Sequence, residues 1–241
     1  MSTLFTCSID DGHPLDLKTA DLLAKHGLTG TFYVPIRNME GPDVMTPEQI
    51  RALSQQFEIG SHTMDHCYLK GVDVWMAYDQ IMDGKKKLED TLGREVEGFC
   101  YPGGKYRRRD IDLVRGCGFK YARTTVNLCF DRGTSPYEIP TTIQFYPHDR
   151  SVYMRNFAEA GNWLKRQDAL LLAMQHENWV DRLFALFDHA CKRGGTFHLW
   201  GHSQEIEQLG AWAELDGFLS YVAAKVDRDK RVRNVQLLEA A

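Results

Sequence analysis

Two adjacent carboxylates and three histidines are the side chains of this sequence best suited to catalysis. Asp10 and Asp11 are neighbours early in the chain. His62 and His66 lie four residues apart, and His202 follows much later. One carboxylate and two imidazoles make a three-ligand site with a position open for water, which is typical of catalytic rather than structural zinc. The other carboxylate could then act as a base and the third histidine as an acid.

Each of these features is weak evidence when taken alone. An Asp-Asp-Gly segment is usually a solvated turn, and nine histidines in 241 residues give some pairs at this spacing by chance. The alternative for His202 is a buried histidine of an aromatic strand. If the chain turns helical after Gly60, His62 and His66 would face the same side. The hypothesis therefore depends on all three features meeting in space.

The elements predicted around these residues would bring them together. Short apolar runs predict strands at residues 4–9, 30–34, 57–61, 98–101, 121–126 and 196–200. Amphipathic stretches predict helices at residues 15–26, 74–92, 179–192 and 212–226, and a further helix capped by Thr46. This alternation indicates parallel βαβ units in one α/β domain. Functional groups of α/β barrels collect at the carboxyl ends of the strands, where the three features are placed.

Composition indicates an ordinary globular protein. The chain has 43% hydrophobic and 26% charged residues, and its net charge of −4 gives no electrostatic basis for binding nucleic acid. At this length the core needs no metal or disulfide to hold it together. We therefore expect a single domain over residues 1–241 and no nucleic-acid partner.

The spacing of the cysteines and the first residues of the chain indicate the cellular compartment of the protein. The six cysteines form no CxxC motif, and the closest pair, Cys117 and Cys129, is 12 residues apart. Free thiols in a reducing compartment are therefore expected. The chain starts without a basic segment followed by a long apolar one, and no window approaches the length of a membrane span. We expect a cytoplasmic protein with no membrane span.

One stretch interrupts the alternation of strands and helices. Residues 127–178 are aromatic and charged without a clear period. We expect an irregular insertion here, which could be a mobile cover over an active site or a plain structural addition.

The motifs, taken in order, resemble the polysaccharide deacetylase family, the NodB-homology domain of carbohydrate esterase family 4. They are Asp10-Asp11-Gly12, His62-x-x-x-His66, Pro102-Gly103-Gly104 and His202. The resemblance extends over roughly residues 4–240. It implies an α/β fold, a single-domain distorted (β/α)7-type barrel, and metal-dependent removal of acyl groups from amino sugars.

The resemblance also implies roles for individual residues. Asp11, His62 and His66 match the metal ligands of the family, and Asp10 matches its general base. A divalent metal lowers the pKa of bound water toward ~7, and Asp10 would take the proton as this water attacks the amide carbonyl. We expect Zn²⁺, although such a site also accepts Co²⁺, Ni²⁺, Mn²⁺ or Fe²⁺.

Two further groups would complete the reaction. A backbone N–H near Gly103 would contribute to an oxyanion hole, a kind of contact worth roughly 10²–10³ in rate. His202 would protonate the leaving amine.

The sequence departs from the family pattern at two points. Family members commonly carry an arginine two residues before the motif proline, where it holds the catalytic base, and Cys100 occupies that position here. An aspartate–tryptophan segment that tunes the acid histidine has no convincing match. Arg123 alternates with Tyr121 and Thr125 on one strand face, so it could point into the barrel mouth and replace the missing arginine. A structural salt bridge is the other interpretation of Arg123.

Several other side chains are candidates for contact with substrate. They are His13, Tyr101, Tyr146, His148 and Arg150. His13 lies close to the paired carboxylates, although it could simply cap the turn. Those after residue 127 offer stacking and charge suited to a sugar that carries phosphate or carboxylate, and surface packing is the alternative.

These expectations favour a cytoplasmic, metal-dependent hydrolase that removes an N-acyl group, most simply acetyl, from an amino sugar. In that compartment a sugar nucleotide, a lipid-linked glycan precursor or an oligosaccharide destined for surface polysaccharide fits better than an intact cell-wall polymer. One alternative is hydrolysis of another non-peptide C–N bond on the same barrel, for which the absent motif arginine leaves room. The other is a catalytically inactive barrel that binds carbohydrate.

Overall fold

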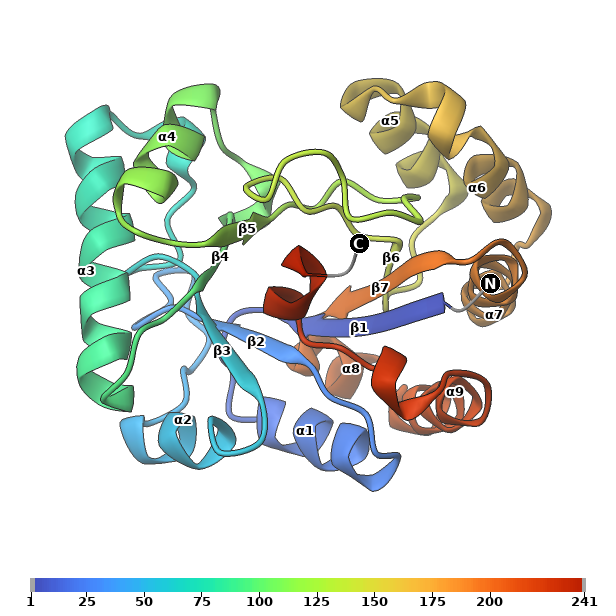
Figure 1. Cartoon of the computed structure of the whole chain (residues 1–241), viewed down its shortest axis with the longest axis horizontal. Coiled ribbons are helices and arrows are strands. Elements are labelled where there is room, and N and C mark those ends of the chain that lie inside the picture. Colours follow the sequence, from blue (N-terminus) through green and yellow to red (C-terminus); the bar gives the residue numbers. More distant parts are fainter. Residues whose placement is uncertain (1–2, 240–241) are drawn as a thin grey trace.

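The protein is a curled parallel sheet surrounded by helices, and the computed structural model describes residues 3–239 (Figure 1). Seven strands lie in the order β5-β4-β3-β2-β1-β7-β6, and every pair is parallel. The strands are β1 (Thr3–Ile9), β2 (Thr31–Val34), β3 (Glu58–Ser61), β4 (Gly98–Cys100), β5 (Tyr121–Arg123), β6 (Ile143–Gln144) and β7 (Gly195–Gly201). The strands predicted from the apolar runs are confirmed, and β6 is additional.

The strand order follows the chain around a circle that is open between β5 and β6. One extended segment spans this opening. Ile139 forms a bridge with Arg123 of β5, and three residues later the Thr142 amide donates to His198 of β7 (2.9 Å). This segment contacts the edge strand β5 and then continues into β6, the other edge strand, so the predicted distorted (β/α)7 barrel is confirmed, with its distortion at this position.

Helices cover the outside of the sheet. They are α1 (Asp16–Lys25), α2 (Pro47–Leu53), α3 (Val74–Leu92), α4 (Arg108–Gly116), α5 (Arg150–Ala160), α6 (Trp163–Gln175), α7 (Trp179–Arg193), α8 (Ser203–Leu209) and α9 (Trp212–Lys225). The predicted cap is present, because the Thr46 hydroxyl accepts from the Gln49 amide and the Gln49 side chain accepts from the Thr46 amide. Within residues 3–239, no helix is both long and apolar enough to cross a membrane.

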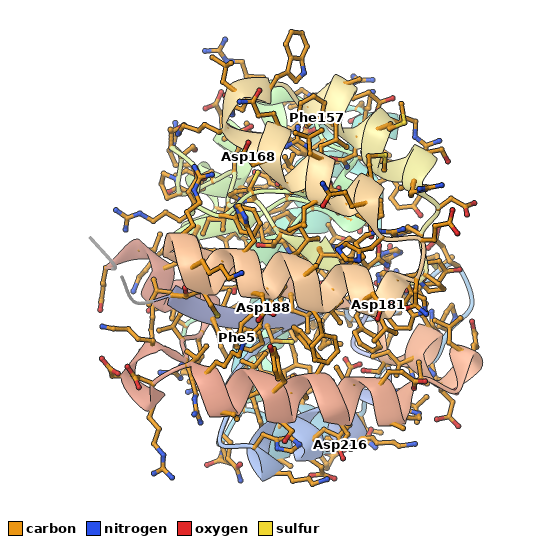
Figure 2. The ribbon with its side chains drawn as sticks, turned by 90° about the vertical axis from the view of Figure 1, so that its right-hand side faces the viewer. Phe5, Phe157, Asp168, Asp181, Asp188 and Asp216 are labelled. Atoms are coloured by element: carbon orange, nitrogen blue, oxygen red, sulfur yellow. The ribbon has the colours of Figure 1, made fainter. Side chains whose placement is uncertain are left out.

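Figure 2 shows α7 and α9 side by side across one face, with α5 and α6 beyond α7. Asp188 of α7 joins this layer, since it accepts hydrogen bonds from Tyr221 (2.9 Å) and Lys225 (2.7 Å) of α9. Beneath the helices lies the apolar core. Phe5, Phe187 and Phe197 stack and meet edge to face there, with ring centroids 5.2–6.4 Å apart.

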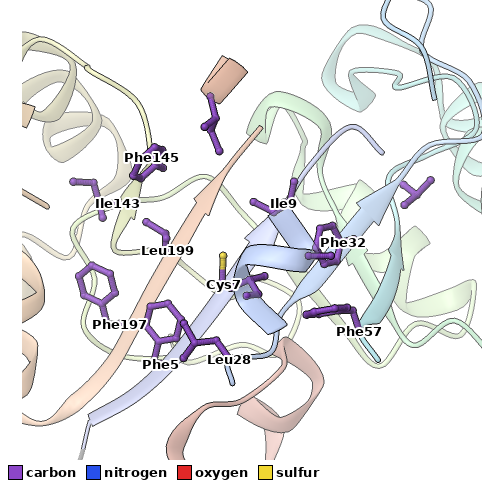
Figure 3. Close-up of a cluster of buried hydrophobic side chains, with 14 of the residues drawn as sticks. Phe5, Cys7, Ile9, Leu28, Phe32, Phe57, Ile143, Phe145, Phe197 and Leu199 are labelled. Carbon is purple, nitrogen blue, oxygen red and sulfur yellow. The ribbon is translucent and has the colours of Figure 1, made fainter. Parts of the chain in front are cut away.

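Alternate side chains of each strand point to opposite sides, and the two sides differ in character. Those facing the helices are apolar, as Figure 3 shows for Phe5, Cys7 and Ile9 of β1. The residues between them, Thr6 and Ser8, are buried polar groups inside the barrel. The barrel interior is therefore a polar column rather than an apolar core.

The final described segment holds this column at the amino ends of the strands. It contains two short 3₁₀ helices, Arg228–Lys230 and Asn234–Leu238, and crosses the centre of the sheet in Figure 1. Asn234 accepts from Thr6 (2.7 Å) and donates to Tyr33 (2.8 Å). Tyr33 donates to Tyr121, which donates to Glu58 (2.7 Å). The opposite, carboxyl end of the barrel is left for the functional groups.

The stretch 127–178, expected to be irregular, contains β6 and the helices α5 and α6. The expectation is wrong for these helices. The buried positions are Tyr153 in α5 and Arg166, Ala169 and Ala173 in α6, so neither helix shows the stripe of large apolar side chains that identifies an amphipathic helix. Their sequence therefore carries few of the signals that identified the other helices.

The buried His198 should make the fold sensitive to acid. Burial, followed by the charge of Arg123, lowers the pKa of His198 to about 3. Below about pH 6.5 the unfolded chain takes up a proton here that the folded chain does not, so stability is lost as pH falls, by up to ~1.4 kcal/mol per pH unit. We predict that His198→Gln flattens this decline. Urea unfolding at several pH values measures it, and equal slopes for the variant and the parent protein would contradict the assignment.

Candidate metal centre and active site

The predicted functional residues meet at the carboxyl end of the barrel. Asp10 and Asp11 follow β1, His62 follows β3, and His202 follows β7. All four line one cleft of about 420 Å³. The expectation that the three sequence features lie together is confirmed.

The Asp-Asp-Gly segment forms a turn that sends its two carboxylates in different directions. Asp11 has a left-handed backbone (φ 77°), and so does Gly12 (φ 63°). A Cβ atom on Gly12 would lie 2.7 Å from Val34, so a larger residue would clash as well as be strained. The turn buries Asp10 against the barrel interior and directs Asp11 toward the histidines.

A loop, not a helix, brings His62 and His66 together. The expectation of a helical turn after Gly60 is wrong, because Thr63 and His66 have left-handed backbones (φ 67° and 57°). Two hydrogen bonds fix the loop. The Thr63 hydroxyl accepts from the amide of Cys67 (2.8 Å), and the side-chain oxygen of Gln80 in α3 accepts from the amide of Asp65 (2.9 Å). The two rings still face each other, with centroids 5.0 Å apart.

The three side chains fit a divalent metal ion. The Nε2 atom of His66 lies 3.2 Å from Asp11 Oδ1, and that of His62 lies 3.6 Å from it. Asp11 Oδ1 is buried without a hydrogen-bond donor of good geometry in residues 3–239, which leaves it available as a ligand. All three donor atoms lie within 4.8 Å of one another. One carboxylate and two imidazoles suit zinc and its neighbours in the first transition row.

The outer nitrogens of the two histidines have different surroundings. His62 Nδ1 forms a hydrogen bond with the Cys100 carbonyl (2.8 Å), which fixes the tautomer and leaves Nε2 to bind metal. His66 Nδ1 lies 3.0 Å from the Glu40 carboxylate but without the geometry of a hydrogen bond. Burial opposes ionisation of Asp11, but the two imidazoles outweigh it and hold the pKa of Asp11 below its ordinary range.

A second group of potential ligands, Asp10, His62 and Cys100, fits a metal less well. Burial raises the pKa of the Cys100 thiol well above its ordinary value, so the thiol is protonated. Asp10 Oδ1 is already paired with the guanidinium of Arg123. The Asp11 group is the better site.

Arg123 lies where the sequence placed it, inside the barrel mouth. It is fully buried and pairs with Asp10, and its guanidinium lies 5.3 Å from the ring of Tyr33 and 4.8 Å from that of Trp200. Cys100 is the register partner of Arg123 on the neighbouring strand, and its thiol lies 3.7 Å from Asp10 Oδ2. An arginine from β5 thus reaches Asp10 beside the position where the family pattern has one on β4.

The partner of His202 was missed in the sequence. Glu205, in the first turn of α8, lies 2.7 Å from His202 Nδ1, and Gln144 donates to the same carboxylate (3.0 Å). Burial opposes protonation of His202, but Glu205 and Asp11 outweigh it and raise the pKa of His202 to about 9. The His-x-x-Glu spacing, which places the two side chains on the same face if a helix starts there, was the signal available.

Of the other predicted site residues, Gly103 and His148 line the cleft. Gly103 lies in a 3₁₀ turn with a left-handed backbone (φ 56°), and His148 contacts Gln144 (2.8 Å). Arg150 does not line it, because its guanidinium donates to the Met174 carbonyl (3.0 Å) and pairs with Glu177.

Three more predicted contacts also lie outside the lining of the cleft. Tyr101 is fully buried and donates to the Tyr137 carbonyl (3.1 Å). His13 accepts from the Leu15 amide (3.1 Å), which is the turn-capping role. Tyr146 packs beside His148, with ring centroids 4.8 Å apart. Sequence position near a motif therefore did not decide which side chains reach the cleft.

Comparison with known proteins agrees with this arrangement. The sequence model of the polysaccharide deacetylase family matches residues 4–122, and through this segment the chain belongs to that family. A curated relative, the putative polysaccharide deacetylase YxkH of Bacillus subtilis (strain 168), is 25% identical over 120 residues. The match covers 49% of this chain and 43% of that relative.

Solved structures show the same fold over nearly the whole chain. A putative polysaccharide deacetylase from Mycobacterium smegmatis has a TM-score of 0.59 at 19% identity, covering 93% of this chain and 85% of its own. The Bc1960 peptidoglycan N-acetylglucosamine deacetylase has a TM-score of 0.59 at 14% identity, covering 100% of this chain and 90% of its own.

Metal binding should depend on both loop histidines. We predict that His62→Ala and His66→Ala each weaken zinc binding by more than ~100-fold, since even outer contacts of a metal site are typically worth 10–100-fold. Elemental analysis after dialysis against zinc measures this. His148→Ala is the matched control, because His148 lines the same cleft outside the cluster and its loss should leave zinc content unchanged. Full occupancy in both loop variants would contradict the assignment.

Proposed function

We propose that this protein is a metal-dependent hydrolase that removes an N-acyl group, most simply acetyl, from an amino sugar. The observation that carries the proposal is the meeting of three sets of side chains at one cleft or directly behind its wall. They are the loop histidines with Asp11, Asp10 with Arg123, and His202 with Glu205. Metal ligands, a base and an acid are the set that amide hydrolysis requires.

Asp11, His62 and His66 would hold the metal, for which we propose Zn²⁺, with Co²⁺, Ni²⁺, Mn²⁺ and Fe²⁺ as substitutes. When bound, the ion would supply Lewis acidity to the acyl carbonyl and to water.

Asp10 is the base in this proposal. The guanidinium of Arg123 pairs with the Asp10 carboxylate and fixes the orientation of its Oδ1 atom. The Oδ2 atom, which lies near the Cys100 thiol, is the one left to accept the proton of an attacking water. The buried ring faces of Tyr33 and Trp200 hold the guanidinium in place.

His202 is the acid. Its Nδ1 is occupied by Glu205, so Nε2 is left to donate a proton to the leaving amine. The raised pKa keeps the imidazole protonated near neutral pH, as this role requires. A backbone N–H near Gly103, on the wall of the cleft, would contribute to an oxyanion hole.

For the substrate we propose a glycan precursor in the cytoplasm, as an intermediate of surface polysaccharide synthesis. The name of one structural neighbour, a peptidoglycan N-acetylglucosamine deacetylase, supports an N-acetylated amino sugar as the chemical class. The six cysteines are free thiols, which are typical of proteins in a reducing compartment.

The two alternative functions, hydrolysis of another C–N bond and carbohydrate binding without catalysis, have less support from the structure than from the sequence. The absent motif arginine left room for another C–N bond, but Arg123 stands beside Asp10 in its place. A purely binding barrel would have no need for a buried base beside a set of metal ligands.

Acetate release tests the proposal. We predict that the zinc-loaded protein releases acetate, and no ammonia, from a panel of N-acetylated saccharides and sugar nucleotides. Asp10→Asn should keep the metal but lose at least ~100-fold in kcat, since a general base typically contributes 10²–10⁴. Arg123→Lys keeps the positive charge but loses the rigid fork, so it should also lower kcat with the zinc content unchanged.

Three results would contradict parts of this proposal. Ammonia instead of acetate would favour the other C–N bond. Near-normal kcat in Asp10→Asn would show that another group activates the water. Near-normal kcat in Arg123→Lys would show that orientation by the fork is unimportant.

A further inference from the structure

The hairpin of α5 and α6 contains a buried arginine bound by oxygen atoms. Arg166 of α6 is 1% exposed, and in residues 3–239 no carboxylate pairs with it. Its guanidinium donates instead to the carbonyls of Asn127 (2.9 Å), Gly161 (2.9 Å), Phe157 (3.3 Å) and Asn156 (3.3 Å). Figure 2 shows where the hairpin lies, with Phe157 labelled on α5 and Asp168 on α6.

The same guanidinium also fixes two side-chain amides. Arg166 donates to Asn156 Oδ1 (2.9 Å), which also accepts from the backbone amide of Asn127 (3.3 Å). It donates more weakly to Asn127 Oδ1 (3.4 Å). A guanidinium has no acceptor, so the amide oxygens must face it and the NH₂ groups must point away.

Both asparagines line the same cleft as the proposed metal ligands. In residues 3–239 neither Nδ2 atom donates to a protein acceptor, and neither is buried without a partner. Each amide therefore presents two hydrogen-bond donors whose orientation is set before any ligand arrives.

The charge of the cleft limits what these donors can bind. Four carboxylates line it, those of Asp10, Asp11, Glu40 and Glu205, and no lysine or arginine does so among the described residues. Lys105 stacks on the Tyr68 ring (3.9 Å) but is not part of the lining. A divalent ion would offset two of the four negative charges. Besides the metal, a phosphate or carboxylate on the substrate would find one cation on the wall of the cleft, the His202 imidazolium, and that group is already paired with Glu205.

We propose that Asn127 and Asn156 are a specificity-determining donor pair that binds hydroxyl or carbonyl oxygens of an uncharged amino sugar. Arg166 is the positioning residue that holds both amides in this orientation. The inference rests on the proposed function for the identity of the reaction and goes further by assigning the substrate class. The enzyme takes an uncharged N-acetylated glycan rather than a sugar phosphate or a sugar nucleotide.

Asn156→Asp separates the donor role from a structural one. Aspartate keeps the two oxygens that accept from Arg166, the side-chain Oδ1 and the backbone carbonyl of residue 156. Its charge strengthens the contact with the guanidinium, so the melting temperature should be unchanged or higher. It removes both donors, so binding should weaken. We expect the Kd for tri-N-acetylchitotriose to rise about tenfold or more. In turnover the loss should appear in KM rather than in kcat.

The matched control is Asn162→Asp. Asn162 precedes α6 in the same hairpin but is exposed and does not line the cleft, so the same added charge there should leave the Kd unchanged. UDP-N-acetylglucosamine, tested as the charged probe, should bind the parent protein more weakly than the neutral trisaccharide.

Binding is measured on the zinc-loaded protein by ligand-observed NMR, which needs no turnover. Unchanged trisaccharide binding by Asn156→Asp would overturn the proposal. So would tighter binding of the nucleotide sugar by the parent protein, or no binding of the trisaccharide at all. Failure of the proposed function looks different, because the trisaccharide would bind with the predicted pattern while no acetate is released.

Discussion

The buried ion pair between Asp10 and Arg123 is the interaction on which the site depends. Two adjacent carboxylates at a barrel mouth would repel each other and compete for the same partners. The pair with Arg123 holds Asp10 in the interior, and the left-handed turn at Asp11 sends the second carboxylate to the histidines. Removing one partner of a buried ion pair leaves an uncompensated charge, typically at a cost of ~3–5 kcal/mol. The base and the metal ligands are thereby kept in separate roles.

The two ends of the barrel differ in the polar groups that they contain. At the amino end, Asn234 and the tyrosines of β2 and β5 satisfy the polar interior with neutral hydrogen bonds. At the carboxyl end the same interior column finishes in charged groups around the cleft. The α5–α6 hairpin adds a wall to this cleft, and its own buried cation, Arg166, is satisfied by carbonyl and amide oxygens. At the carboxyl end, the ion pair of Asp10 and Arg123 brings buried charge into the barrel interior beside the cleft.

Much of this arrangement could be predicted from the sequence, and the exceptions have physical reasons. Short apolar runs and amphipathic stretches identified most elements, and strand parity placed Arg123 inside the barrel. The conformation of the histidine loop could not be predicted, because two non-glycine residues adopt left-handed backbones that tertiary contacts impose. Tyr101 and Arg150 were misplaced because neither nearness to a motif nor the charge of a side chain says which way that side chain turns. Glu205 was missed because the family pattern places the partner of the acid histidine in an aspartate–tryptophan segment, whereas here a glutamate in the first turn of α8 takes this position.

Anomalous diffraction at the zinc edge from crystals of the metal-loaded protein tests the central claim most directly. That claim is that Asp11 and the two loop histidines bind the metal while Arg123 keeps Asp10 free to act as a base. The account predicts one strong peak in the cleft, bonded to Asp11, His62 and His66, with Asp10 still paired to Arg123. A peak bonded to Asp10 or Cys100, with the Arg123 pair broken, would contradict it.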